Sequence, residues 1–310
     1  MRKQIIVSAP AKIHLLGEHS VVYARPALLT AINKRVYVRI KEGKEKNPKS
    51  NNVRIRKVVE SVVEGFFRQK IPPHTLSIEA TFPVGCGLGA SAAICAAYIG
   101  ALLLLLGKKF DKEKINQLSY DCEKVFHGNP SGADNATVVF GGLVWYIKEL
   151  ESIKLLKKLD DSSISRLTQF VLINSSKPEE TTKEMVEKVA GLAKKYPSRV
   201  KNIFYEQEIL VKQLAQAILL KNYNSLMFAI RQGERNLEEL GVVGKKAKGI
   251  IREVERAGGV AKICGGGGVK NGSGMILCFH QDANAILEIA TRQQLEAFPI
   301  LFEKEGVRIE

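Results

Sequence analysis

The chain has 310 residues, of which 45% are hydrophobic and 25% charged, and a formal net charge of +15. These values are ordinary for a globular protein whose core is large enough to fold alone, as one large domain or two medium ones. The lysines are spread along the chain, with no block of about five or six like charges. The positive charge therefore indicates a solvated surface more than a nucleic-acid-binding one.

The cysteine spacing and the apolar runs indicate the cellular compartment of the protein. The five cysteines are odd in number and form no C-x-x-C pair, so we expect free, buried thiols in a cytoplasmic protein. The apolar run at the N-terminus is too short for a signal peptide. Residues 91–106 carry no charge, but they are fewer than the roughly 18 to 20 that a spanning helix needs. We expect a helix buried in the protein interior and no membrane partner.

Hydrophobic periodicity predicts a first half rich in strands. Pro72-Pro73 ends one helical pattern, and Asp111 is a candidate helix cap. In chain order we expect strands Gln4–Ser8 and Ala27–Lys41, a short strand Val53–Lys57, helix Val58–Gln69, strand Thr75–Phe82, helices Ser91–Leu106 and Asp111–Phe126, and strand Leu143–Lys148.

The second half changes composition and becomes mainly helical, so we place a domain boundary near residue 165. A small antiparallel sheet should accompany its helices. In chain order we expect strand Phe170–Asn174, helices Glu179–Lys195, Ser198–Leu220, Ser225–Leu240 and Gly244–Ala257, strands Val260–Cys264 and Met275–His280, helix Asp282–Gln294, and strands Pro299–Phe302 and Val307–Ile309.

Residues 82–93, FPVGCGLGASAA, join a predicted strand to a predicted helix. Gly85, Gly87 and Gly89 permit positive φ and close backbone approach. The first N–H groups of a helix are unpaired and lie at its positive end, so the segment suits phosphate. The alternative is a glycine-rich turn with Ser91 as an ordinary helix cap. The spacing is neither the Walker form nor G-x-G-x-x-G, so a phosphate-binding lysine must come from elsewhere.

Two further segments carry candidate polar groups. Lys12, Glu18 and His19 are predicted around a turn and suit a site, although a surface turn with a salt bridge would give the same pattern. Glu123 lies near the end of a predicted helix, where it could be an exposed residue. Asp134 follows in a turn-rich stretch, where it could be a helix cap.

Together these segments resemble the motifs of the GHMP kinase superfamily, which includes galactokinase, homoserine kinase, mevalonate kinase and phosphomevalonate kinase. Residues 9–28 (APAKIHLLGEHSVVYARPAL) are similar to the first motif in its mevalonate kinase form, and residues 127–136 (HGNPSGADNA) resemble the stretch that holds the catalytic aspartate of mevalonate kinases. Residues 83–93 (PVGCGLGASAA) resemble P-x-x-x-G-L-G-S-S-A-A, and residues 262–268 (KICGGGG) resemble the late glycine loop more loosely. Order and spacing fit over most of the chain.

The resemblance implies a two-domain α+β fold. Residues 1–165 would form a ribosomal-protein-S5-like domain that binds ATP, and residues 166–310 a ferredoxin-like domain that completes the substrate cleft. It implies ATP- and Mg²⁺-dependent phosphorylation of the primary hydroxyl of (R)-mevalonate, for isoprenoid biosynthesis. Whether the chain forms a homodimer stays open.

Three alternatives remain at this point. Another GHMP kinase, such as a phosphomevalonate or sugar kinase, would keep the same phosphate chemistry. A non-catalytic ligand sensor would be expected to have lost Lys12 or Asp134, and both are present. A nucleic-acid binder would show affinity that falls steeply as salt rises.

Residue roles follow from the same resemblance. Asp134 matches the aspartate that accepts the proton of the attacking hydroxyl, and Lys12 matches a lysine that would hold it ionised and offset charge on the transferring phosphoryl group. Ser91 and Glu123 match Mg²⁺ ligands, which are oxygen donors as this ion requires. The loop around the ATP phosphates would be Pro83, Val84, Gly85, Cys86, Gly87, Leu88, Gly89, Ala90 and Ser91, and the contacts to mevalonate would be Glu18, His19 and Thr182.

The chain also departs from the family pattern. Ala90 replaces the usual first serine of the second motif, which removes one hydroxyl contact to phosphate. Glu180 stands where mevalonate kinases often have an arginine, so recognition of the substrate carboxylate is open. The late loop lacks the usual T-G-A start and is followed by what looks like an insertion, residues 269–274.

Overall fold

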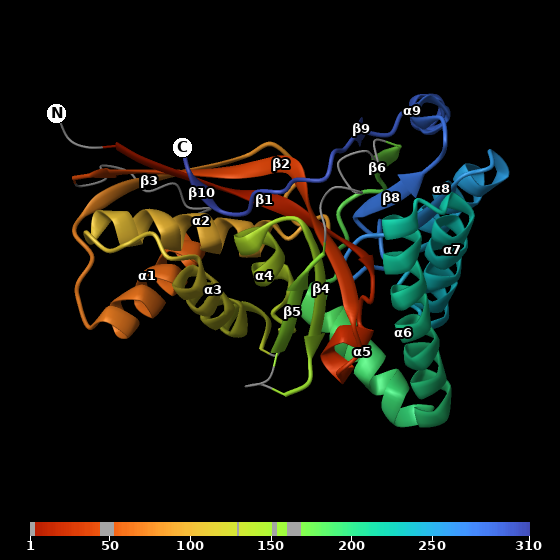
Figure 1. The fold of residues 1–310 in the computed structure, drawn as a ribbon, viewed down its shortest axis with the longest axis horizontal. Coiled ribbons are helices and arrows are strands. Elements are labelled where there is room, and N and C mark those ends of the chain that lie inside the picture. Colours follow the sequence, from red (N-terminus) through yellow and green to blue (C-terminus); the bar gives the residue numbers. More distant parts are fainter. Residues whose placement is uncertain (1–3, 44–52, 129, 151–153, 160–168) are drawn as a thin grey trace.

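The computed structural model describes residues 4–43, 53–128, 130–150, 154–159 and 169–310. In these ranges the chain forms two antiparallel sheets, each with its own helices, arranged one after the other along the long axis of the molecule (Figure 1). The predicted boundary near residue 165 lies outside the described residues, and the division of the chain at that point stays a prediction.

The first sheet has the strand order β10-β1-β2-β4-β5, with β3 also paired to β2. Every pairing is antiparallel. Its strands are β1 (Gln4–Leu16), β2 (Ala27–Glu42), β3 (His74–Ala80), β4 (Leu143–Lys148), β5 (Lys154–Lys158) and β10 (Arg308–Ile309).

The first strand is longer than expected. β1 continues past Ser8 to Leu16, because the register shift between Pro10 and Ala11 absorbs the proline that would otherwise interrupt the ladder. Lys12 therefore lies on a strand, and the prediction that it belongs to a turn is wrong. Only Gly17 and the residues after it form the turn.

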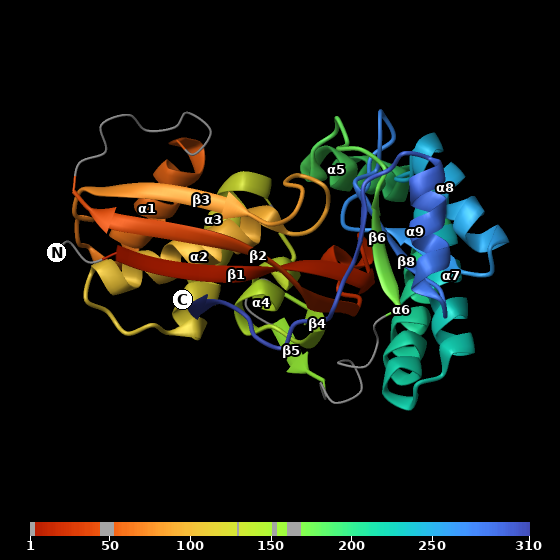
Figure 2. The same cartoon turned by 90° about the horizontal axis from the view of Figure 1, so that it is seen from above.

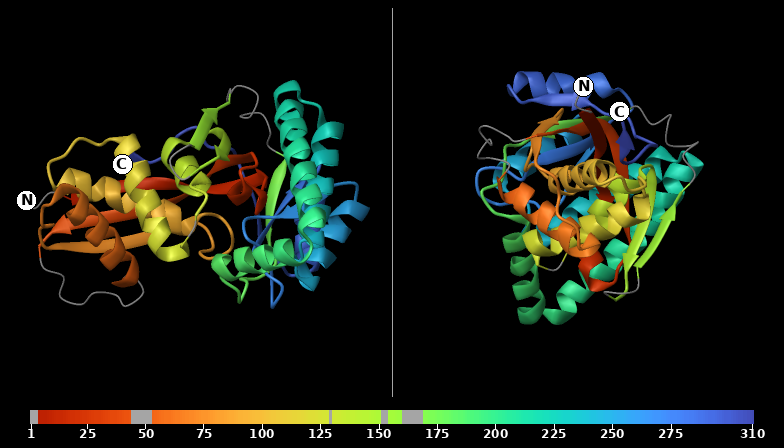
Figure 3. Two further views of the ribbon diagram at one scale, coloured as in Figure 1. Left: turned by 90° about the horizontal axis from the view of Figure 1, so that it is seen from below. Right: turned by 90° about the vertical axis from the view of Figure 1, so that its left-hand side faces the viewer.

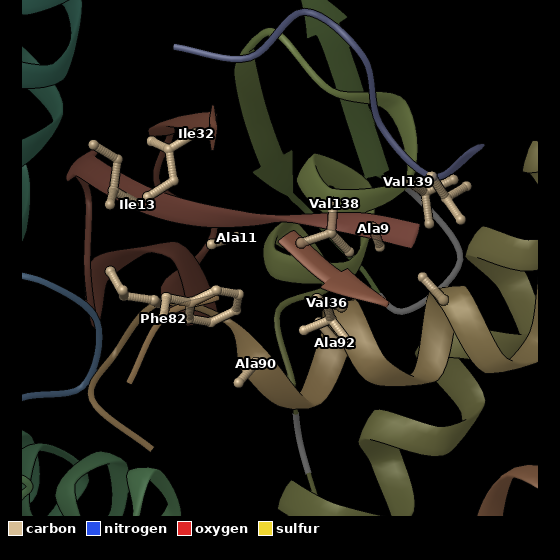
Figure 4. Packing of buried hydrophobic residues seen from close by; sticks show 14 of the residues in the cluster. Ala9, Ala11, Ile13, Ile32, Val36, Phe82, Ala90, Ala92, Val138 and Val139 are labelled. Atoms are coloured by element: carbon tan, nitrogen blue, oxygen red, sulfur yellow. The ribbon is translucent and has the colours of Figure 1, made fainter. Parts of the chain in front are cut away.

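Two of the four helices of this half lie against one face of this sheet and the other two pack onto them from outside, and the left view of Figure 3 shows the helices in front of the strands. Figure 4 shows the packing between β1, β2, α2 and α4, where the small side chains of Ala11 and Ala92 let the layers approach closely and Val138 belongs to the same buried cluster. The expected buried helix is α2, most of whose residues are buried. The helices are α1 (Val53–Phe67), α2 (Ala90–Leu105), α3 (Lys112–His127) and α4 (Ala133–Phe140).

The start of α1 differs from the prediction, whereas the cap of α3 agrees with it. The short strand predicted at Val53–Lys57 is wrong, because Ile55 continues the apolar face that buries Val59 and Val63, so α1 begins at Val53. Asp111 caps α3 as predicted, since its carboxylate accepts the N–H groups of the first turn. No helix in the described ranges is long and apolar enough to cross a membrane.

The second sheet has the order β7-β8-β6-β9 and is antiparallel, as expected for this half (Figure 2). α5, α8 and α9 share one hydrophobic core with one face of it, while α6 and α7 also reach the core of the first sheet. The elements are β6 (Phe170–Asn174), α5 (Thr182–Lys195), α6 (Pro197–Leu220), α7 (Tyr223–Glu239), α8 (Lys245–Arg256), β7 (Val260–Ile263), β8 (Met275–Phe279), α9 (Ala283–Arg292) and β9 (Ala297–Pro299).

The C-terminal segment returns to the first sheet. Ile32 of β2 bridges to Phe302, and β10 pairs with β1 so that Val7 lies opposite Ile309. Both halves are therefore joined by the shared core and by this strand as well as by the chain itself. The five cysteines all lie in the interior as free thiols.

Candidate active site

A cavity of about 640 Å³ lies where the two halves meet. Its walls come from β1 and the turn after it, the glycine loop, α2, α3, the start of α4, the start of α5 and the late glycine loop. Of the predicted site residues, the cavity brings together Lys12, Glu18, His19, Val84, Gly85, Gly87, Gly89, Ala90, Ser91, Glu123, Asp134 and Thr182.

Three residues predicted in the phosphate loop do not line the cavity. Cys86 and Leu88 point their side chains into the core, and Pro83 is only half-buried beside them. Their backbone instead braces the loop, because the Leu88 carbonyl accepts the Lys12 N–H at 3.0 Å and the Cys86 carbonyl accepts the Met275 N–H at 2.9 Å. The loop is thus fixed to strands of both sheets.

Asp134 lies at the centre of the site, held by two residues of β1. Its Oδ2 is 3.0 Å from the Lys12 Nζ, and its Oδ1 is 3.0 Å from the His14 Nε2. The carboxylate keeps 36% of its surface open to the cavity, whereas Lys12 is almost completely enclosed. Asp134 is not a helix cap, because Gly132 occupies the cap position of α4.

Burial and neighbouring charges set the protonation of Asp134 and His14. Burial alone would raise the pKa of Asp134, but the Lys12 charge and the His14 hydrogen bond hold it well below its usual range. Burial and the Lys12 charge lower the pKa of His14. At neutral pH the site therefore contains an ionised carboxylate that accepts from an ammonium group and from the Nε2–H of a neutral imidazole.

His14 was not among the predicted site residues. Its position could have indicated it, since it follows Lys12 by two residues on a strand, and such residues share a face.

Ser91 and Glu123 form an adjacent pair of oxygen donors. The Ser91 hydroxyl donates a short hydrogen bond to the Glu123 carboxylate, and Glu123 is buried rather than exposed on α3. The ordinary-cap hypothesis for Ser91 is wrong, because Gly89 holds the cap position of α2. Burial, with the neighbouring Asp134 charge, raises the pKa of Glu123 to about 7 against the lowering effects of Ser91 and Lys12.

A buried carboxylate and a hydroxyl side by side suit a hard cation such as Mg²⁺. No cluster of three or more His, Cys, Asp or Glu residues that could hold a metal occurs among the described residues. A magnesium ion here would complete its shell with phosphate oxygens and water.

The glycine loop is closely packed against both halves of the protein. A Cβ on Gly89 would lie 2.7 Å from the Lys12 Cγ and Cε, and one on Gly87 would lie 2.3 Å from the Cys264 carbonyl oxygen. A Cβ on Gly85 would lie 3.3 Å from the Nζ of Lys177. Lysines of β1 and of the segment before α5 therefore lie against the loop, and the second of these, Lys177, was not predicted.

Glu18 and His19 are buried, so the surface-turn alternative is wrong. Glu18 forms an ion pair with the fully buried Lys262 of β7. The His19 Nε2 donates to the Gly266 carbonyl at 3.1 Å, and burial lowers the pKa of His19, so its ring is neutral. Thr182 begins α5 beside Gly266. Lys262 is a second residue that sequence reasoning did not single out.

Glu180 does not line the cavity. Its carboxylate accepts the Lys270 N–H at 3.2 Å and the Val269 N–H at 3.4 Å. It therefore anchors the residues that look like an insertion in the late loop.

This geometry places a glycine-rich loop, at the start of a helix, beside an ionised carboxylate that is partly open to the cavity. Residues 54–142 match the sequence profile of the GHMP kinases N terminal domain. A mevalonate kinase from Archaeoglobus fulgidus is 32% identical over 99% of this chain and 100% of its own length.

Solved structures show the same α+β fold. A mevalonate kinase from L. major in complex with R-mevalonate superposes with a TM-score of 0.80, at 18% identity over 99% of this chain and 97% of that one. A phosphomevalonate kinase from Streptococcus pneumoniae in complex with phosphomevalonate and AMPPNP gives 0.74, at 16% identity over 95% and 99% of the two chains.

The fold and site are those of a GHMP kinase. Within that superfamily, the chain belongs to the mevalonate kinase family, because its full-length similarity to a curated member reaches 32% identity.

Proposed function

We propose that this protein transfers the γ-phosphoryl group of ATP to the primary hydroxyl of (R)-mevalonate, giving 5-phosphomevalonate and ADP for isoprenoid biosynthesis. The observation that carries the proposal is the carboxylate of Asp134, held ionised by Lys12 and His14 at the wall of a cavity that also contains the glycine loop. The full-length relatives named mevalonate kinase support the choice of acceptor.

The chain's own residues account for the steps of this reaction. Backbone N–H groups of the loop residues that line the cavity, from Val84 to the first turn of α2 at Ser91, would bind the ATP phosphates. Asp134 would take the hydroxyl proton as the hydroxyl oxygen attacks the γ-phosphorus and the bond to the β-phosphate oxygen breaks. Lys12, 3.0 Å from Asp134, would stabilise negative charge on the transferring group and on the attacking oxygen.

Ser91 and Glu123 would hold Mg²⁺, which neutralises charge on the phosphate oxygens when bound. Glu18, His19 and Thr182 would bind the acceptor. Their positions agree with this, because all three line the cavity and each contacts the late glycine loop or the strand before it.

We also propose a division of labour between the two halves. Residues 1–165 would bind ATP and supply the base, and residues 166–310 would complete the cleft, since the cavity draws its walls from both. We assign the enzyme to the cytoplasm, because five buried free thiols fit a reducing compartment.

A coupled ADP-release assay with ATP and Mg²⁺ tests the proposal. Mevalonate should be turned over, whereas 5-phosphomevalonate, homoserine and galactose run alongside should not. Turnover of another acceptor with none of mevalonate would contradict the proposed substrate and leave the kinase assignment intact.

A further inference from the structure

We infer that Lys183 binds the carboxylate of the acceptor and so makes the enzyme selective for a hydroxy acid over a neutral alcohol. The inference rests on the proposed function, and it names the residue that supplies the positive charge on the acceptor side of the cavity.

The cavity offers few cations for an anionic acceptor. Among the described residues that line it, the lysines are Lys12 and Lys183, and no arginine lines it. Lys12 is already paired with Asp134 at 3.0 Å and is 2% exposed at its side chain. His14 and His19 also line the wall, but burial lowers the pKa of each ring, so neither carries charge at neutral pH. Lys183 is the remaining positive charge among these lining residues, and Lys177, outside the lining, lies against the glycine loop at Gly85.

Its location fits the acceptor end of the cavity. Lys183 follows Thr182 in the first turn of α5. A Cβ on Gly266 would lie 3.3 Å from the Thr182 Cγ2, and the Gly266 carbonyl accepts the His19 N–H, so these residues form one continuous wall. Val186 lines the cavity one turn further along the helix and offers an apolar surface for a methyl group.

The Lys183 ammonium group is available for a ligand. The nearest carboxylate oxygen, from Glu187, is 3.9 Å away, which is too long for a hydrogen bond, and 59% of the Lys183 side chain is exposed. The first turn of a helix disfavours positive charge, so the lysine is not placed there to stabilise α5. A bound carboxylate would supply the close partner that it lacks.

Glu180 does not compete for this role. Its carboxylate is engaged by the N–H groups of Val269 and Lys270, and it would repel the acceptor's carboxylate if it turned inward. Positive charge on this side of the cavity therefore comes from Lys183, three residues later in the chain.

The test compares two acceptors, mevalonate and 3-methylpentane-1,3,5-triol, which replaces the carboxylate with a neutral alcohol. Lys183→Met should raise the KM for mevalonate about tenfold to 100-fold, with kcat little changed, because a charge-assisted hydrogen bond is lost from binding. The KM for the triol, or its inhibition constant against mevalonate if it is not phosphorylated, should stay within about twofold. Lys183→Arg should restore most of the preference for the acid.

Lys194→Met is the matched control, since Lys194 is an exposed lysine of the same helix that does not line the cavity. An equal effect of Lys183→Met on both acceptors, or no effect on mevalonate, would overturn the inference. Absence of mevalonate turnover in the unmodified enzyme would instead contradict the proposed function, so the two failures are distinguishable.

Discussion

At the scale of single residues, the reaction centre depends on a carboxylate whose two oxygens are both held from β1. Asp134→Asn keeps the size of the side chain but removes its charge and its ability to accept a proton. We expect kcat to fall about 10²-fold to 10⁴-fold, the usual contribution of a general base, with ATP affinity changed only a few-fold. Single-turnover phosphorylation and equilibrium ATP binding measure the two effects separately.

Asp121→Asn is the control, because Asp121 lies on α3 and pairs with Lys124 at the surface, 2.6 Å away. It should leave kcat unchanged. Turnover by Asp134→Asn close to that of the control would remove Asp134 from its role as base and would leave Lys12 as the principal charge at the centre.

At the scale of elements, the site depends on two glycine-rich loops that touch. Gly87 has a φ of +89°, and a Cβ there would meet the Cys264 carbonyl oxygen at 2.3 Å. Gly87→Ala should therefore strain the backbone and push the loops apart, which weakens ATP binding about tenfold or more and lowers the free energy of unfolding by about 1–3 kcal/mol. Nucleotide titration and urea unfolding measure the two quantities.

The matched control is Gly65→Ala in α1, where an added Cβ would meet nothing within 4 Å. A helical alanine there should raise the free energy of unfolding by about 0.5–1 kcal/mol and leave ATP binding unchanged. If Gly87→Ala behaved like Gly65→Ala, the contact between the loops would have no part in holding the nucleotide.

The sequence indicates elements better than it indicates contacts. Periodicity, the Asp111 cap and the uncharged apolar run at residues 91–106 predicted β2, α3 and α2 nearly to their ends, because those signals are local. The prediction from the sequence missed β5, because its five residues KLLKK show no clear alternation. It also ended β1 too early, before a proline that a bulge accommodates.

For the site, too, the sequence indicates single residues better than it indicates contacts between distant segments. Motifs identified Lys12, Glu123 and Asp134, yet nothing local indicates that Lys262 pairs with Glu18, 244 residues away, or that Lys177 lies against Gly85. Those contacts depend on how the two sheets meet.

At the scale of the whole molecule, the two sheets are linked by buried charges. Lys262 of β7 pairs with Glu18 and also donates to the His14 carbonyl of β1 at 3.2 Å. Glu234 of α7 accepts the Ile263 N–H at 3.0 Å beside this pair. One buried lysine cannot balance two buried carboxylates, and burial raises the pKa of Glu234 to about 8 although the Lys262 charge and the Ile263 hydrogen bond oppose the shift.

This pKa makes stability depend on pH in a definite direction. Folded Glu234 keeps a proton up to about pH 8, whereas in the unfolded chain it loses that proton near its ordinary value of 4.5. The contribution of Glu234 to the free energy of unfolding is therefore fully present below pH 4.5. It is lost as the pH rises to about 8, by up to about 1.4 kcal/mol per pH unit. The glutamine side chain of Glu234→Gln is neutral at every pH. The variant should therefore lack this decrease in the free energy of unfolding with pH, and it should be more stable than the unmodified protein at pH 8.

Urea unfolding at pH 5 and at pH 8 measures the difference in the free energy of unfolding between the variant and the unmodified protein. The titrations of His14, His19 and Glu123 occur in both proteins and cancel in this difference. Glu239→Gln, an exposed residue of the same helix that pairs with Arg199, should keep the full slope of the unmodified protein. If Glu234→Gln also kept it, Glu234 would be ionised in the folded state, and Lys262 would be stabilising two carboxylates where the two sheets meet.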